Sequence, residues 1–104
     1  MTEIVAAPLE ELPPGRMKLV EDGPLRIGVF NCDGELHAIE DRCTHDDGPL
    51  CLGVWDPEEC TIACPRHGAN FDLISGRALS LPAYLPARTF PVRIEDGVVL
   101  IEVG

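Results

Sequence analysis

Short runs of branched apolar residues alternate along the chain with turn-forming segments, and this pattern predicts a protein built from strands. Turn signals such as "PPG", "EDGP" and "DDGP" recur throughout the chain. Such spacing is typical of an all-β sandwich or barrel. No window shows a convincing helical period. One turn of helix is expected near residues 8–12 or 56–60, where "DPEEC" begins as helix N-termini often do.

Two hairpins are the clearest local predictions. The segments "LRIGVFN" and "ELHAIE" flank an Asp-Gly pair at 33–34, and "TFPVRIE" and "VVLIEV" flank another at 96–97. An Asp-Gly pair between two such runs is a strong hairpin signal. In the last hairpin Phe90, Val92 and Ile94 alternate with proline and polar residues, which predicts one buried and one solvated face.

Length and composition limit the function classes. With 104 residues, 45% of them hydrophobic, the chain is expected to form one domain, residues 1–104. Acidic residues outnumber basic ones 18 to 8, and the net charge of -10 argues against binding nucleic acid or an anionic membrane. The charge suits a partner with a basic docking face, and equally suits simple solubility. With no basic leader and no window near the ~18 apolar residues that span a bilayer, a cytoplasmic location is expected.

The cysteines point to metal or thiol chemistry. There are five, an odd number in a chain without a recognisable secretion signal, which argues against a disulfide framework. Cys32, Cys51 and Cys60 are expected to be buried thiols. A disulfide between Cys51 and Cys60 is an alternative that a reducing cytoplasm does not favour.

The other two cysteines belong to a Cys/His pattern. Cys43 and His45 form Cys-x-His, and 18 residues later Cys64 and His67 form Cys-x-x-His. Both pairs follow predicted strands in turn-rich stretches, so two loops can meet at one site. Zinc modules usually group cysteines on one turn and histidines on another. One cysteine and one histidine on each turn instead suits two iron ions bridged by sulfides, with both cysteines on one iron and both histidines on the other.

With these four ligands the sequence resembles the Rieske family of [2Fe–2S] proteins. "CTH" and "CPRHG" are similar to the two ligand segments of that family, "HGANFDLISG" to the continuation of the second, and "LPARTFPVRIEDGVVLIEV" to its closing strands. The resemblance covers about residues 2–103. It implies an antiparallel Rieske-like β-sandwich or barrel with a two-loop cluster-binding subdomain, and one [2Fe–2S] cluster per chain.

Three positions distinguish kinds of Rieske protein. Respiratory members resemble one another in an extra cysteine on each ligand segment, joined as a disulfide, and in a serine after the His-Gly. The matching residues here are Gly48, Arg66 and Ala69. Ala69 has no hydroxyl to donate to a cluster sulfur, and seven acidic residues against Arg42 alone lie between residues 40 and 59. Both features predict a potential in the lower part of the Rieske range, which spans roughly -150 to +300 mV.

Two further polar side chains, Arg66 and His37, are not among the predicted ligands. Arg66 can pair with Asp46 or Asp47 and so connect the two loops electrostatically, although a solvated arginine is an equal alternative. His37, the only histidine outside the pattern, lies in a predicted strand and is interpreted as structural.

The resemblance implies an electron carrier rather than an enzyme. Such ferredoxins pass single electrons from a flavin-dependent reductase to a terminal oxygenase, and we expect a monomer that meets basic partner faces briefly. An alternative is the small Rieske-like subunit of nitrite reductase, or an accessory ferredoxin of iron–sulfur assembly. An alternative of another class is a zinc-stabilised binding module.

Overall fold

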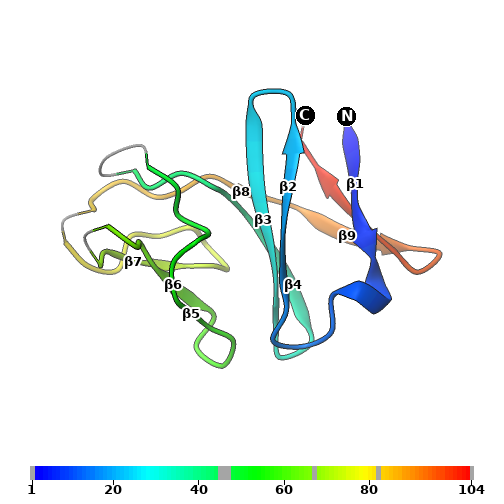
Figure 1. Cartoon of the computed structure of the whole chain (residues 1–104), viewed down its shortest axis with the longest axis horizontal. Coiled ribbons are helices and arrows are strands. Elements are labelled where there is room, and N and C mark those ends of the chain that lie inside the picture. Colours follow the sequence, from blue (N-terminus) through cyan, green and yellow to red (C-terminus); the bar gives the residue numbers. More distant parts are fainter. Residues whose placement is uncertain (1, 45–47, 67, 82, 104) are drawn as a thin grey trace.

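The structure is a computed structural model that describes residues 2–44, 48–66, 68–81 and 83–103. Its described part holds ten strands in three antiparallel sheets and one short 3-10 helix, η1 (Leu9–Glu11) (Figure 1). The strands are β1 (Glu3–Pro8), β2 (Met17–Asp22), β3 (Leu25–Cys32), β4 (Glu35–Glu40), β5 (Trp55–Asp56), β6 (Thr61–Ala63), β7 (Asn70–Asp72), β8 (Thr89–Phe90), β9 (Val92–Glu95) and β10 (Val98–Glu102). The predicted all-β, antiparallel fold class is confirmed, and the described helical residues include no segment long and apolar enough to cross a membrane.

Two sheets form a scaffold with a shared core. The strand order is β1-β10-β9 in one and β2-β3-β4-β8 in the other. Buried residues from both sheets belong to one apolar cluster, which includes Ala7, Ile27, Val29, Val99 and Ile101. The scaffold therefore gives β3 and β4 a fixed position from which the rest of the chain continues.

Both predicted hairpins are present. β3 and β4 pair up to Cys32 and Glu35, and β9 and β10 pair up to Glu95 and Val98, so a two-residue turn closes each hairpin. All four turn residues have positive φ, with 54° and 100° in the first turn and 52° and 74° in the second. These are the conformations that an Asp-Gly pair favours in a two-residue hairpin.

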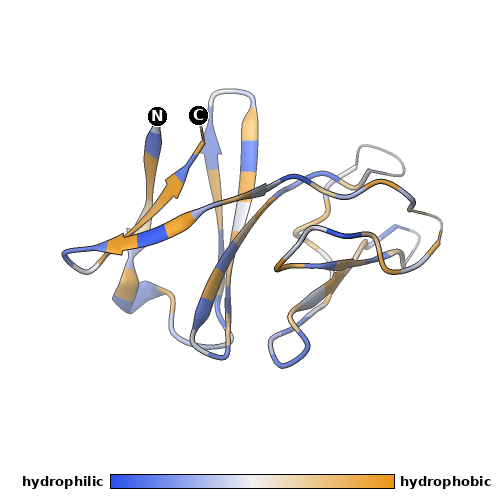
Figure 2. Ribbon diagram, turned by 180° about the vertical axis from the view of Figure 1, so that it is seen from behind, coloured by the Kyte–Doolittle hydropathy of each residue, from blue (hydrophilic) through white to orange (hydrophobic). Residues whose placement is uncertain are grey.

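The segment predicted as one strand over residues 89–95 is divided at Pro91. The part before it, β8, pairs with β4, whereas the part after it, β9, pairs with β10 in the other sheet. Proline lacks the N–H of a ladder hydrogen bond, which suits a change of sheet. The predicted buried face is correct at Phe90 and wrong at Ile94, which is 50% exposed. Polar and apolar residues do alternate along β9 (Figure 2), but β9 is an edge strand that runs out to the hairpin tip.

The helical turn expected at one of two places occurs as η1. Residues 56–60 form a different turn, in which the Asp56 carboxylate accepts hydrogen bonds from the N–H groups of Glu58 (2.9 Å) and Glu59 (3.3 Å). The N–H of Cys60 donates to the Asp56 carbonyl at 2.7 Å. This is the bonding of a helix N-cap followed by a single i→i+4 turn, which does not continue because Cys60 has a positive φ of 56°.

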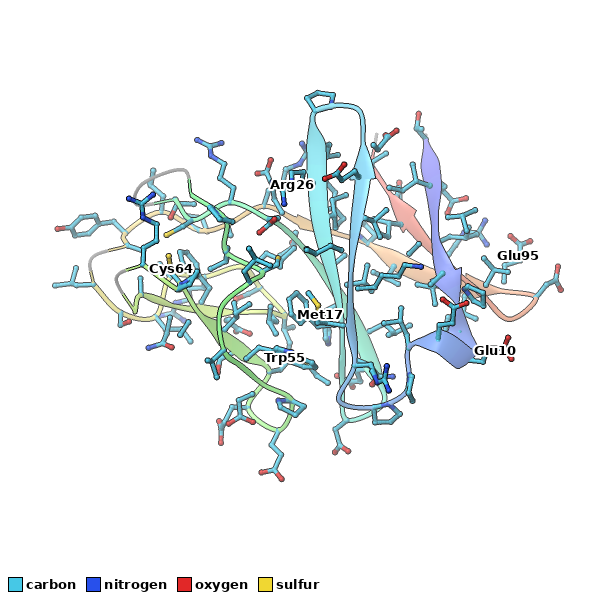
Figure 3. All side chains as sticks on the ribbon, viewed as in Figure 1. Glu10, Met17, Arg26, Trp55, Cys64 and Glu95 are labelled. Atoms are coloured by element: carbon cyan, nitrogen blue, oxygen red, sulfur yellow. A yellow bond between two sulfur atoms is a disulfide. The ribbon has the colours of Figure 1, made fainter. Side chains whose placement is uncertain are left out.

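A smaller unit lies between β4 and β8 in the chain and contains the third sheet, of order β5-β6-β7. In Figure 1 it lies beside the scaffold, and a second apolar cluster joins the two. The Phe30 ring on β3 meets the Trp55 ring on β5 edge-on, with centroids 5.0 Å apart. Met17 and Trp55 lie at this junction, and Cys64 lies farther out in the smaller unit (Figure 3).

A disulfide also links the two units, and it corrects the interpretation of two cysteines, Cys32 and Cys60. Cys32, the last residue of β3, is bonded to Cys60 in the turn before β6, with Cα atoms 5.5 Å apart. The expectation that both are buried thiols is wrong, and so is the alternative pairing of Cys51 with Cys60. The pairing brings together residues 28 positions apart, which local sequence patterns do not indicate. Cys51 is a buried thiol, as expected.

Candidate metal centre

Two loops of the smaller unit contain the predicted ligands. The first loop, residues 41–51, follows β4, and the second loop, residues 64–69, connects β6 to β7. In the first loop the N–H of Cys43 donates to the Gly48 carbonyl at 2.8 Å. In the second, the N–H of Cys64 donates to the Ala69 carbonyl at 2.7 Å, and the N–H of Gly68 donates back to the Cys64 carbonyl at 2.9 Å. The backbone of each cysteine is therefore fixed by hydrogen bonds within its own loop.

The fold brings the two predicted cysteine ligands into one interior. Cys43 and Cys64 are both buried, both are thiols rather than halves of a disulfide, and both belong to the cluster that joins the smaller unit to β3. His45 and His67, the other two predicted ligands, lie outside the described residues. Within the described ranges, no group of three or more potential metal ligands occurs.

A third segment, residues 79–87, covers the first loop and was not identified from the sequence. The Thr44 hydroxyl donates to the Leu85 carbonyl at 2.7 Å. The segment is held at its ends where the N–H of Leu79 donates to the Asn70 carbonyl and the N–H of Ala87 donates to the Gly76 carbonyl, both at 2.7 Å. Buried Ala83 extends the cluster around the cysteines. The prolines of "LPAYLPAR" indicate an irregular segment, but nothing in that pattern places it against the first loop.

The first loop packs closely against β3 through Cys51. A Cβ at Gly28 would lie 2.5 Å from the Cys51 sulfur, so only glycine leaves room for this side chain. Burial raises the pKa of the Cys51 thiol well above its ordinary value, and the neighbouring Asp41 carboxylate raises it further. Cys51 therefore stays a neutral thiol, which suits packing rather than metal ligation.

The three positions that distinguish kinds of Rieske protein, Gly48, Arg66 and Ala69, all belong to the part of the chain that the structure describes. Gly48 and Ala69 are buried, Ala69 completely, while Arg66 is exposed in the second loop. The pairing proposed for Arg66 involves Asp46 and Asp47, which lie outside the described residues. His37 lies in β4 with its Nε2 atom 3.5 Å from a Glu35 carboxylate oxygen and its side chain 20% exposed, in keeping with the structural interpretation.

The described donors fit an iron–sulfur cluster. Thiolates are the ligands that such clusters require, and two thiols from separate loops lie in one buried, largely apolar cluster. Small side chains, Ala69 and Ala83, belong to the same cluster. An apolar shell of this kind limits solvent access to a metal group.

Comparison with known proteins agrees with this geometry. A relative from Photorhabdus laumondii, the ferredoxin subunit of 3-phenylpropionate/cinnamic acid dioxygenase, is 40% identical over the whole chain and 97% of its own length. The ferredoxin of carbazole 1,9a-dioxygenase from Nocardioides aromaticivorans is 29% identical with a TM-score of 0.89, and 97% of each chain is covered. A complex of reduced oxygenase and oxidised ferredoxin in carbazole 1,9a-dioxygenase contains a chain that is 28% identical, with a TM-score of 0.88 over 95% of this chain and 91% of that one.

The family itself is identified by its sequence model. The model of the Rieske [2Fe-2S] domain matches residues 2–91, which include both loops, the covering segment and the scaffold strands up to β8. The expected Rieske-like fold and its cofactor, one [2Fe–2S] cluster per chain, are therefore confirmed. This chain belongs to the Rieske [2Fe–2S] domain family.

Proposed function

We propose that Cys43, His45, Cys64 and His67 hold the cluster, and that the chain acts as a single Rieske domain over residues 1–104. The observation that carries the proposal is that Cys43 and Cys64, from two separate loops, are both buried thiols of the cluster that joins the smaller unit to β3. The two histidines follow their cysteines by two and three positions, so each loop supplies one sulfur and one nitrogen ligand.

The function is one-electron transfer, and the chain is not itself an oxygenase. When bound, the cluster takes up and releases a single electron. The protein's own residues exclude water around the ligand sulfurs, and backbone hydrogen bonds within each loop fix the two cysteines. The named relatives are likewise ferredoxin components of dioxygenase systems.

A low potential is part of the proposal. Ala69, two positions after His67 in the sequence, is buried and has no hydroxyl group. Hydrogen bonds to the sulfurs raise the potential of such clusters, and surrounding negative charge lowers it. Acidic residues of the inter-loop region, among them Asp56, Glu58 and Glu59, are exposed. Both features favour the lower part of the Rieske range.

The partners follow from chemistry and from the relatives. We propose that a flavin-dependent reductase supplies the electron and a terminal oxygenase accepts it, as an oxygenase occurs with ferredoxin in the carbazole dioxygenase complex. Several apolar side chains of the smaller unit are exposed: Val54 by 84%, Tyr84 by 81%, and also Leu52, Leu81 and Leu85. We propose that they contribute to the docking face, and that the acidic net charge of the chain favours a brief encounter with a basic partner face. A monomer in the cytoplasm completes the proposal.

The test is the metal content of the wild-type protein and of Cys64→Ala. Wild-type protein is expected to be reddish-brown with two irons and two sulfides per chain, and Cys64→Ala is expected to be colourless. Cys51→Ala serves as the control, because Cys51 is a buried cysteine outside the proposed ligand set. A colourless wild-type protein that contains one zinc ion would instead identify a zinc-stabilised binding module.

A further inference from the structure

One buried carboxylate in the first loop has no part in the ligand set. The side chain of Asp41 is completely buried, with 0% exposure. Its Oδ1 atom accepts two hydrogen bonds, from the N–H of Leu50 at 2.8 Å and from the N–H of Cys51 at 2.7 Å. Charged side chains are seldom buried to this extent unless they form ion pairs or hydrogen bonds inside the protein.

The two bonds join the ends of the first loop. Asp41 is the first residue of that loop, and Leu50 and Cys51 are its last two. Cys43 lies between them, in the turn closed by its own bond to Gly48. Because Leu50 and Cys51 are buried, their N–H groups would lack an acceptor without Asp41, at a cost of about 1–3 kcal/mol each. The carboxylate thus closes the loop that presents Cys43.

The same carboxylate also fixes the loop on the scaffold. The other oxygen, Oδ2, lies 3.2 Å from Nη2 of Arg26 on β3, and the N–H of Asp41 donates to the Arg26 carbonyl at 2.8 Å. Two residues farther along β3, Gly28 leaves the space that Cys51 fills. The Asp41 side chain therefore closes the loop, and its contact with Arg26 adds to the backbone bond and the Cys51 packing that place the loop on β3.

We propose that Asp41 is a positioning residue of the cluster site: its buried carboxylate holds the first loop in the shape, and at the place on β3, that ligation by Cys43 and its neighbour His45 requires. This inference rests on the proposed ligand set. Asp41 touches no reacting atom, and it acts through the backbone of the first loop.

The experiment compares three variants with wild-type protein. Asp41→Ala removes the acceptor, whereas Asp41→Asn keeps an oxygen at the same place. Asp56→Ala is the matched control, because Asp56 also accepts from two backbone N–H groups, but in an exposed turn outside the ligand loops. Two properties are measured at a temperature where circular dichroism shows every variant folded: the half-life of cluster loss and the EPR spectrum of the reduced protein.

Asp41→Ala is expected to lose its cluster roughly tenfold faster than wild type and to show a shifted EPR spectrum. Asp41→Asn and Asp56→Ala are expected to keep the wild-type spectrum and a half-life within about twofold of it. The inference is overturned if Asp41→Ala matches wild type in both measurements, if Asp41→Asn is as labile as Asp41→Ala, or if Asp56→Ala is equally labile. A wild-type protein without an EPR signal would overturn the proposed function itself, and this inference with it.

Discussion

Ala69 is the single residue on which the proposed low potential most depends. Replacing it with serine would place a hydroxyl group at a fully buried position in the second loop. One new hydrogen bond to a cluster sulfur, worth about 1.4 kcal/mol in favour of the reduced state, corresponds to a rise of about 60 mV for one electron. A redox titration of Ala69→Ser measures it. Ala38→Ser, which adds a hydroxyl to the buried scaffold core, is the control and should leave the potential unchanged.

The raised pKa of the buried Cys51 thiol should make the free energy of unfolding depend on pH. Its folded-state pKa is raised, so this thiol stays protonated in the folded chain above about pH 8.5, where an unfolded thiol ionises. The unfolded state then binds fewer protons, and stability falls as pH rises, by up to about 1.4 kcal/mol per pH unit. Below that range the contribution is fully present. Urea denaturation of wild type and Cys51→Ser at pH 8, 9 and 10 measures the difference.

The stability of wild type relative to Cys51→Ser should decline over that series, because serine does not titrate there. A difference that stays constant between pH 8 and pH 10 would show that the Cys51 thiol ionises equally in both states.

The disulfide that attaches the smaller unit to the scaffold is expected to contribute measurably to the free energy of unfolding. It connects the end of β3 to the turn before β6 across 28 residues of sequence. A closed loop of that length is worth about 3 to 4 kcal/mol in the chain-entropy model. The double variant Cys32→Ala/Cys60→Ala should lose about that much free energy of unfolding, as measured in urea.

Thiol counting checks the bond itself. Of five cysteines, two are in the disulfide, so alkylation of the denatured, unreduced chain after iron removal should label three: Cys43, Cys51 and Cys64. Labelling of all five would contradict the bond.

Elements differ in how far the sequence predicts them. Hairpins closed by Asp-Gly are local, since the turn residues decide both position and register, and both were predicted correctly. The division at Pro91 was not predicted. The alternation of polar and apolar residues continues through Pro91, although the chain passes there from one sheet to the other. The Cys32–Cys60 bond and the contacts of Asp41 join distant residues, so no local signal marks them. The Cys/His spacing selected Cys43 and Cys64, which are both buried thiols of the cluster that joins the smaller unit to β3, and the full ligand set stays a prediction.

The molecule as a whole has its cluster unit at one end and the β9–β10 hairpin toward the other, which predicts where partners bind (Figure 1). Tyr84→Ala should raise the KM for this protein in oxygenase turnover several-fold, since aromatic residues dominate such contacts, with little change in kcat. Ile94→Ala is the control: Ile94 is also apolar and exposed, but lies on the hairpin. Equal effects of both variants would contradict the docking face. Added salt should slow the reaction because opposite charges steer the encounter.

Ligation of iron by two histidine nitrogens and two cysteine sulfurs is the central claim. Pulsed EPR of the reduced protein, prepared with nitrogen-15 in its histidines only, tests it most directly. We predict strong coupling from two histidine nitrogens, lost when His45 and His67 are both replaced by cysteine. His37, the third histidine, would contribute nothing. A reduced cluster without histidine coupling, or a protein without iron, would contradict ligation by two histidines and two cysteines.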